Sequence, residues 1–219
     1  MKDPKFNLYV CHSGTVRIAP GVDLSRVYVD DGAELIVDSG ARLRGVMVDA
    51  GGSLTVYEGG YADSVIENGG DVVDCSKPDD SEVYYQKNVV YGASVSRDRD
   101  MSLHSGTTAC DVCVHPGGFL MIYSGGSATD VRLADAVDAN DIFDDFSSCA
   151  AANLQVLDGG YVSGCRIGSG AEFRVSSGGT ALGLVLEQGA ILSFQQGAKV
   201  EYTERQIVLY EPEEEEDDE

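Results

Sequence analysis

The sequence predicts an all-β chain that folds as a single-domain parallel β-solenoid, and three observations support this fold class. Apolar positions recur every 19 residues, so that Leu35 and Val37 are followed by Leu54 and Val56. The apolar runs are short and alternate with polar residues, as in strands with one buried face. Glycines close these runs at spacings that alternate between 8 and 11 residues along 32–59. A fixed period in this range is the signature of stacked repeat units.

Each unit is predicted to contain two short strands and two glycine corners. Glycine supplies the positive φ of a tight corner and lets neighbouring backbones approach closely. Two short strands cannot bury a core alone, but stacked in parallel roughly 4.8 Å apart they form continuous apolar ladders. The runs are too short for helices, and hairpin strands would not need such strict register. The predicted corner glycines are Gly40, Gly59, Gly125, Gly159 and Gly178.

The N-terminal part of the chain is expected to begin with a cap. Phe6, Leu8 and Val10 alternate with polar residues and predict a capping strand over the first coil. A cap is needed because the end of a solenoid exposes strand edges that can pair with another chain. Regular turns then follow over residues 15–30 and 32–71.

Two breaks interrupt the repeat, at residues 71–100 and 134–152. The first is predicted as an irregular turn with a bulged loop at about 74–82, and the second as a short helix. Loops that leave a solenoid often carry binding. One hypothesis therefore joins both breaks into one lateral partner surface, and the alternative is unrelated loops on opposite sides. The aromatic residues assigned to the partner surface are Tyr84, Tyr85, Phe143 and Phe146.

The remaining segments complete the predicted domain, which spans residues 1–210. Residues 101–133 and 153–206 return to the pattern, giving about nine turns in all. The apolar run at 207–210 is predicted as a last strand that closes the end. Residues 211–219 are almost entirely acidic and are predicted to be a disordered tail.

The charge balance excludes some partners. The chain has 15 Lys and Arg against 37 Asp and Glu, a net charge of −22. Nucleic acids and anionic membranes require a basic surface, so neither is expected as a partner. Acidity favours solubility and opposes end-to-end stacking, while a specific cation or basic partner remains the alternative. No apolar run is long enough to cross a membrane, and residues 1–14 lack the apolar core of a signal peptide. The chain is therefore expected either to stay inside the cell or to be a processed or recombinant piece.

The six cysteines predict no metal or redox site. By repeat register Cys165 takes a core position, while Cys110 and Cys113 form a lone CxxC. A zinc site would need a second pair. The aspartates of the second break lack the glycine and glutamate positions of a calcium-binding EF-hand loop. No metal or cofactor is therefore expected, and the cysteines predicted as free thiols or disulfide partners are Cys75, Cys110, Cys113 and Cys149.

The sequence contains no nucleophile–base pair, which favours a protein without enzymatic activity. His12, His104 and His115 have no evident partners in the sequence, as is usual for surface or corner histidines. A carbohydrate-active β-helix lyase or hydrolase would use paired carboxylates, but so acidic a chain produces such pairs by chance. The enzyme and a cytoplasmic scaffold or assembly protein remain the alternatives.

The repeat frame Gly-Gly-x-Leu-x-Val-x-x-Gly-Gly-x-Ala-x-x-x-Val resembles the strand-loop-strand repeat of AIDA-type autotransporter passengers. Ala62, Ala109, Ala128 and Ala181 occupy the alanine position of that repeat, and the resemblance covers most of residues 14–206. It implies a bacterial adhesin solenoid at the cell surface or outside the cell. Adhesion or self-association, with a protein or glycan partner, is the function it implies. Some members are O-glycosylated, and Ser64, Thr129 and Ser163 lie in the segment where acceptors are expected.

Overall fold

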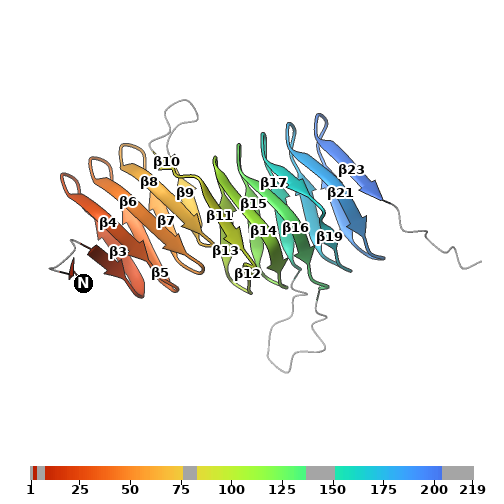
Figure 1. Ribbon diagram of the computed structural model, residues 1–219, viewed down its shortest axis with the longest axis horizontal. Helices are drawn as coiled ribbons and strands as arrows, with labels where there is room; N and C mark the ends of the chain where they lie inside the picture. The colour runs from red at the N-terminus through yellow and green to blue at the C-terminus, as the bar shows by residue number, and fades with distance from the viewer. Residues whose placement is uncertain (1, 4–7, 76–82, 137–150, 204–219) are drawn as a thin grey trace, which may run out of the picture.

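The computed structural model describes residues 2–3, 8–75, 83–136 and 151–203. These residues form strands and turns without a helix, and the strands stack in parallel as a β-solenoid of about 9 turns (Figure 1). The predicted fold class is confirmed. No helix in this part of the chain has the length and apolar character needed to cross a membrane.

Long and short strands alternate along the chain, and each kind forms its own sheets. We name the strands up to β10 the first stack and those from β11 onward the second stack. The first stack consists of β1 (Lys2–Asp3), β2 (Leu8–Cys11), β3 (Gly14–Ile18), β4 (Asp23–Val29), β5 (Ala33–Val37), β6 (Arg42–Asp49), β7 (Ser53–Val56), β8 (Tyr61–Asn68), β9 (Asp71–Asp74) and β10 (Val83–Tyr85). The second consists of β11 (Asn88–Tyr91), β12 (Ser94–Val95), β13 (Asp100–Leu103), β14 (Thr107–Val114), β15 (Phe119–Ile122), β16 (Ser127–Leu133), β17 (Asn153–Val156), β18 (Tyr161–Ser163), β19 (Arg166–Ile167), β20 (Glu172–Val175), β21 (Thr180–Leu186), β22 (Ile191–Phe194) and β23 (Lys199–Thr203).

The 19-residue repeat is the register of the parallel strands. Val27 of β4 lies beside Val46 of β6, which lies beside Val65 of β8. Such ladders bury two separate apolar clusters, one from Cys11 to Val83 and one from Val90 to Leu184. Cys165 is fully buried in the second cluster, as its register predicts, and burial raises the pKa of its thiol to about 12.

The corners need glycine for two reasons. Gly40, Gly59, Gly125, Gly159 and Gly178 have φ values of 80°, 84°, 74°, 70° and 79°. This left-handed region strains any residue with a Cβ atom. A Cβ atom on Gly159 would also lie 2.6 Å from Oγ of Ser124, one turn below.

A bend inside the long strands was not predicted. Arg26, Ser64, Asp111 and Asp130 have φ between 54° and 58°, and Gly45 takes the position between the first two with φ of 66°. These residues follow the same 19-residue register, so each long strand bends at one height. Positive φ at Arg26 is strained, because only glycine and, less often, asparagine or aspartate adopt it readily.

The first coil is covered by an antiparallel pair. β1 pairs antiparallel with β2, and β2 pairs in parallel with β4. β2 begins at Leu8, within the predicted capping strand. The predicted closing strand at 207–210 and the acidic tail at 211–219 lie outside the described residues, as do Phe143, Phe146, Cys149 and the predicted helix of the second break.

The two breaks occupy different corners of the coil. The first follows β9, a short strand, and precedes β10. The second follows β16, a long strand, and precedes β17. Corners after short strands and corners after long strands lie at opposite edges of the coil, so the described ends of the breaks do not share a face. This differs from the hypothesis of one lateral surface, because residue spacing along a repeat does not determine which of its two corners is extended.

The stacks meet at a lateral step in the register. Val83 pairs with Ala62 near the start of β8, whereas Asn88 pairs with Thr107 at the start of β14. Between them, the Nδ2 atom of Asn88 donates to the carbonyl oxygen of Glu67 near the end of β8, at 2.7 Å. β14 therefore begins where β8 ends, and the second stack is displaced along the strand direction. We name residues 67–72, 83–91 and 100–104 the joint.

Candidate functional site

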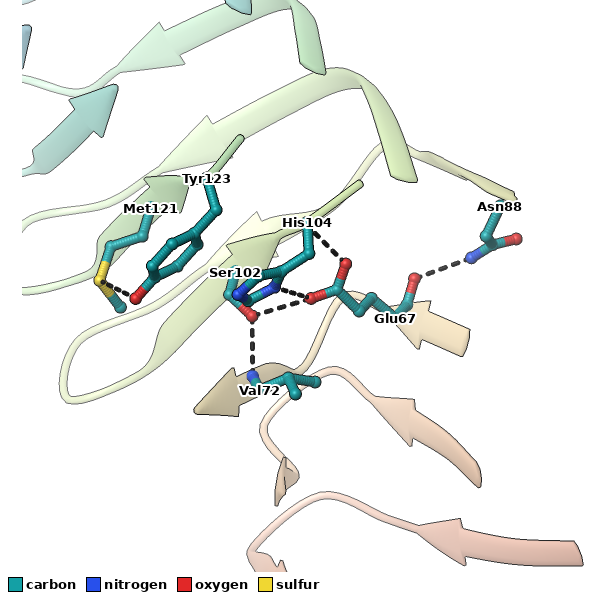
Figure 2. Close-up of polar contacts among 7 residues, drawn as sticks. All are labelled: Glu67, Val72, Asn88, Ser102, His104, Met121 and Tyr123. Carbon is teal, nitrogen blue, oxygen red and sulfur yellow. Dashed lines mark hydrogen bonds and ion pairs between the residues drawn. The ribbon is translucent and has the colours of Figure 1, made fainter. Parts of the chain in front are cut away.

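The joint contains a buried carboxylate. Glu67 lies on the inward ladder that continues from Val29 through Val48, and its side chain is fully buried. Its Oε2 atom accepts the backbone N–H of His104 at 2.8 Å. Its Oε1 atom lies 2.6 Å from Nδ1 of His104 and accepts the hydroxyl of Ser102 at 3.1 Å (Figure 2). An ionised carboxylate only accepts hydrogen bonds, so Nδ1 of His104 carries a proton.

Ser102 connects the short strands of the two stacks. Its side chain is fully buried, and its Oγ atom accepts the backbone N–H of Val72 at 2.7 Å (Figure 2). The backbone N–H of Ser102 donates to the carbonyl oxygen of Gly70 at 3.3 Å. A side-chain oxygen thus takes the place of a ladder carbonyl where the register steps. The carboxylate of Glu67 and the hydroxyl of Ser102 together bind across the joint.

The imidazole ring of His104 is covered on both faces. The ring of Tyr85 stacks on one face at a centroid distance of 4.5 Å, and the ring of Tyr123 on the other at 4.1 Å. The Tyr123 hydroxyl donates to the sulfur of Met121 at 3.5 Å. Tyr85 was predicted as part of an exposed partner surface. Instead its ring packs inward on His104, because Tyr85 pairs with the inward residue Val65.

Burial strongly affects the ionisable groups around the network. Burial and the charge of Asp100 raise the pKa of Asp71, whereas its hydrogen bond with Ser102 lowers it. Burial also raises the pKa values of Asp100 and Tyr85. Within the described residues, Oδ1 of Asp71 and the Tyr85 hydroxyl have no hydrogen-bond partner. Glu67 is therefore well paired, while the groups beside it pay a desolvation cost.

A histidine paired with a carboxylate is also the arrangement of an acid–base catalyst. In the joint, however, Glu67 is fully buried and His104 is only 9% exposed. No group of three or more metal-ligating side chains occurs among the described residues. The arrangement is suited to holding two elements together.

Two histidines have partners that the sequence did not reveal. His104 pairs with Glu67, and Nδ1 of His12 lies 2.7 Å from Oδ2 of Asp30. The interpretation of His104 as a surface or corner residue without a partner is therefore wrong. Glu67 was missed although a signal existed, since it is the acid that falls 19 residues after the buried Val48. No such signal existed for His104, because its partner lies across the step in register.

The outer face of the joint exposes aromatic and aliphatic side chains. Tyr84 is 53% exposed, and its ring lies 5.6 Å from that of Tyr61. Val89 and Tyr91 of β11 are 47% and 75% exposed. At the opposite edge, an ion pair of Arg99 with Asp31 borders a shallow depression between the stacks. The predicted thiols Cys75, Cys110 and Cys113 are free in the described part of the chain.

Comparison with known proteins gives little similarity. No family model matches the chain, and no curated protein matches it. Among solved structures, the crystal structure of a TibC-catalysed hyper-glycosylated TibA fragment is 16% identical, with a TM-score of 0.30. The match covers 90% of this chain and 88% of that one. Similarity at this level transfers no function. The AIDA-type resemblance rests on the repeat frame and the solenoid.

Proposed function

We propose that this chain is a non-enzymatic, adhesin-like β-solenoid of a bacterial surface that mediates adhesion or self-association through a protein or glycan partner. The observation that carries this proposal is the outer face of the joint, where Tyr84 and Tyr91 are exposed on parallel strands. Tyrosine is enriched in binding surfaces because its rigid ring contributes a large contact area. A location at the cell surface or outside the cell follows from the resemblance of the repeat frame.

The buried pair supports the non-enzymatic part of the proposal. A general base must come within hydrogen-bond reach of the proton that it removes. The only proton-accepting face of a neutral His104 ring is its Nε2 edge, since Nδ1 is bound to Glu67 and both π-faces are covered by tyrosines. A polysaccharide chain bound between paired carboxylates needs an open cleft instead. We therefore assign Glu67 and His104 to structure.

The test combines an adhesion assay with a turnover assay on the same purified chain. Beads coated with the chain should aggregate or retain bacterial or host cells, and heat-unfolded chain on the beads should not. A polysaccharide panel incubated with the chain should release no reducing ends or unsaturated uronates. Turnover that disappears in a folded Glu67→Gln variant would overturn the proposal in favour of a carbohydrate-active enzyme. Failure of coated beads to bind any surface would overturn the adhesive role.

A further inference from the structure

The outer face of the joint is one continuous surface. Val83 and Val90 are buried, so the neighbouring Tyr84, Val89 and Tyr91 point outward. β10 pairs with β8 of the first stack and continues after two residues into β11, which pairs with β14 of the second. The exposed side chains therefore lie on the same side of the coil. We name Tyr61, Tyr84, Val89 and Tyr91 the tyrosine face.

Guanidinium groups already lie over tyrosine rings on this molecule. The Cζ atom of Arg42 is 5.3 Å from the ring centroid of Tyr61, and that of Arg17 is 5.7 Å from the ring of Tyr57. Arg42 and Tyr61 are neighbours in the ladder of β6 and β8, and the ring of Tyr84 continues the row. Among the described residues, no cation lies over the rings of Tyr84 or Tyr91.

Each exposed tyrosine has an aspartate beside it. Asp63 is the cross-strand neighbour of Tyr84, and Asp111 follows Cys110, the cross-strand neighbour of Tyr91. Asp63 and Asp111 form no ion pair within the part of the chain that the structure describes. A ring next to an unpaired carboxylate attracts a guanidinium twice, through the π-face and through the opposite charge.

The remaining charges leave this arrangement available. Arg44, the neighbour of Asp63 on β6, forms its ion pair with Asp23 at 3.6 Å. Lys87 lies between Tyr84 and Val89 in the sequence, but the stem of its side chain lies against the corner at Gly106. The tyrosine face therefore combines open rings with uncompensated negative charge.

We propose that the tyrosine face binds a cationic segment of a partner protein, with arginine side chains of the partner over Tyr84 and Tyr91 and beside Asp63 and Asp111. This rests on the proposed function, because adhesion requires a partner. The net charge of −22 attracts such a segment at long range and repels a second copy of the chain. A neutral glycan would stack on the rings but would gain nothing from the two aspartates.

The test uses two fluorescent peptides of equal charge, (Arg-Gly)5 and (Lys-Gly)5, with fluorescence anisotropy at physiological salt. The double variant Tyr84→Ala and Tyr91→Ala should raise the Kd of the arginine peptide roughly tenfold. Asp63→Asn with Asp111→Asn should also weaken binding. Tyr84→Phe with Tyr91→Phe should bind like the wild type, because the rings remain. Tyr202→Ala removes a tyrosine that is 46% exposed on the distant β23, and should change nothing.

Two outcomes would overturn this proposal. Equal binding by the Tyr84→Ala/Tyr91→Ala variant and the wild type would show general attraction to an acidic chain. Sedimentation of the same variant without peptide is the second measurement, and loss of self-association there would identify a second copy as the occupant. The melting temperature should stay within about 2 °C of the wild type, since both side chains are exposed.

The two proposals fail separately. Peptide binding that ignores the tyrosines, in a chain whose coated beads still adhere, overturns the cationic partner and leaves the adhesive function. Tyrosine-dependent peptide binding, in a chain whose beads never adhere, supports the tyrosine face and overturns the adhesive function.

Discussion

One ladder position separates a regular turn from the joint. Val29, Val48 and Glu67 lie side by side on β4, β6 and β8, and all three are fully buried. Valine contacts residues one turn away, as the repeat dictates. Glu67 instead contacts Ser102 and His104, which are 35 and 37 residues further along the chain. A repeat can therefore stack only straight upward, and a sideways step requires partners that are not one repeat apart.

The two regions are also stabilised differently. A buried leucine such as Leu54 contributes roughly 1.5–3 kcal/mol by leaving water. A buried carboxylate is costly unless its oxygens are fully hydrogen-bonded, and Glu67 accepts three bonds in compensation. The joint thus fixes where the second stack sits more than it adds to the free energy of unfolding.

The largest expected effect comes from removing the buried carboxylate. Glu67→Ala leaves the Ser102 hydroxyl and two N–H groups of His104 without an acceptor, and it opens a cavity. The free energy of unfolding should fall by about 3–5 kcal/mol, as when one partner of a buried charged network is removed. Chemical denaturation followed by far-UV circular dichroism measures this loss.

Two variants sharpen the result for Glu67. Asp63→Ala changes an outward acid on the same strand and should have an effect below about 0.5 kcal/mol. Glu67→Val restores the valine ladder but not the acceptor, so it should remain destabilising. If Glu67→Val were as stable as the wild type, the polar network would be unimportant and the joint would be an ordinary turn.

The next effect tests a regular corner. Gly159→Val places a β-branched residue at φ of 70° and puts its Cβ atom 2.6 Å from Oγ of Ser124. The cost should be about 2–3 kcal/mol, from backbone strain and the clash together. Gly92→Ala is the matched control, because Gly92 has φ of 61° with no atom within 4 Å of its Cβ position. An unchanged melting temperature for Gly159→Val would contradict the corner assignment.

The fold was predictable where the repeat is regular. The step from Leu35 to Leu54 is the register of β5 and β7, and a period in the sequence becomes a ladder because parallel strands align equivalent residues. The register also survives the second break, since Leu120 pairs directly with Leu154. The strand bend at Arg26 was not predictable, because arginine carries no signal for positive φ.

The joint was predictable only in part. The position of Glu67 on an apolar ladder could be derived from the 19-residue step, as noted above. The pairing with His104 could not, because the lateral displacement of the second stack breaks the arithmetic that links equivalent residues. The inward side of Tyr85 failed for the same reason, since the register shifts between Tyr84 and Tyr85.

A smaller effect is expected from the link between the short strands. Ser102→Ala removes the acceptor for the backbone N–H of Val72 and one donor to Glu67. A buried N–H without a partner should cost about 1–2 kcal/mol. Ser127→Ala is the control, because its hydroxyl bonds only Thr108 on the outer face, at 2.9 Å. Equal stability of both variants would show that the side-chain oxygen does not replace a ladder bond.

The smallest effect concerns Asp71, and it depends on pH. Burial raises the pKa of Asp71 above its ordinary value of 3.8. The folded protein then holds this proton to a higher pH than the unfolded chain does. The stabilising contribution of the protonated group is therefore fully present below about pH 3.8 and is lost as the pH rises through the folded pKa. Asp71→Asn cannot ionise, so its melting temperature should exceed that of the wild type at pH 7 and not at pH 3.

Asp31 provides a control of opposite sign for this pH dependence. Its hydrogen bond with Arg99 lowers its pKa, so its stabilising contribution is present at neutral pH and is lost as the pH falls. Asp31→Asn should therefore lower the melting temperature slightly at pH 7 and not at pH 3. The two substitutions remove the same charge at the same joint, so a general charge effect would move both melting temperatures in one direction. Shifts of equal sign would show that net charge, rather than burial beside Glu67 and Asp100, sets the response of Asp71.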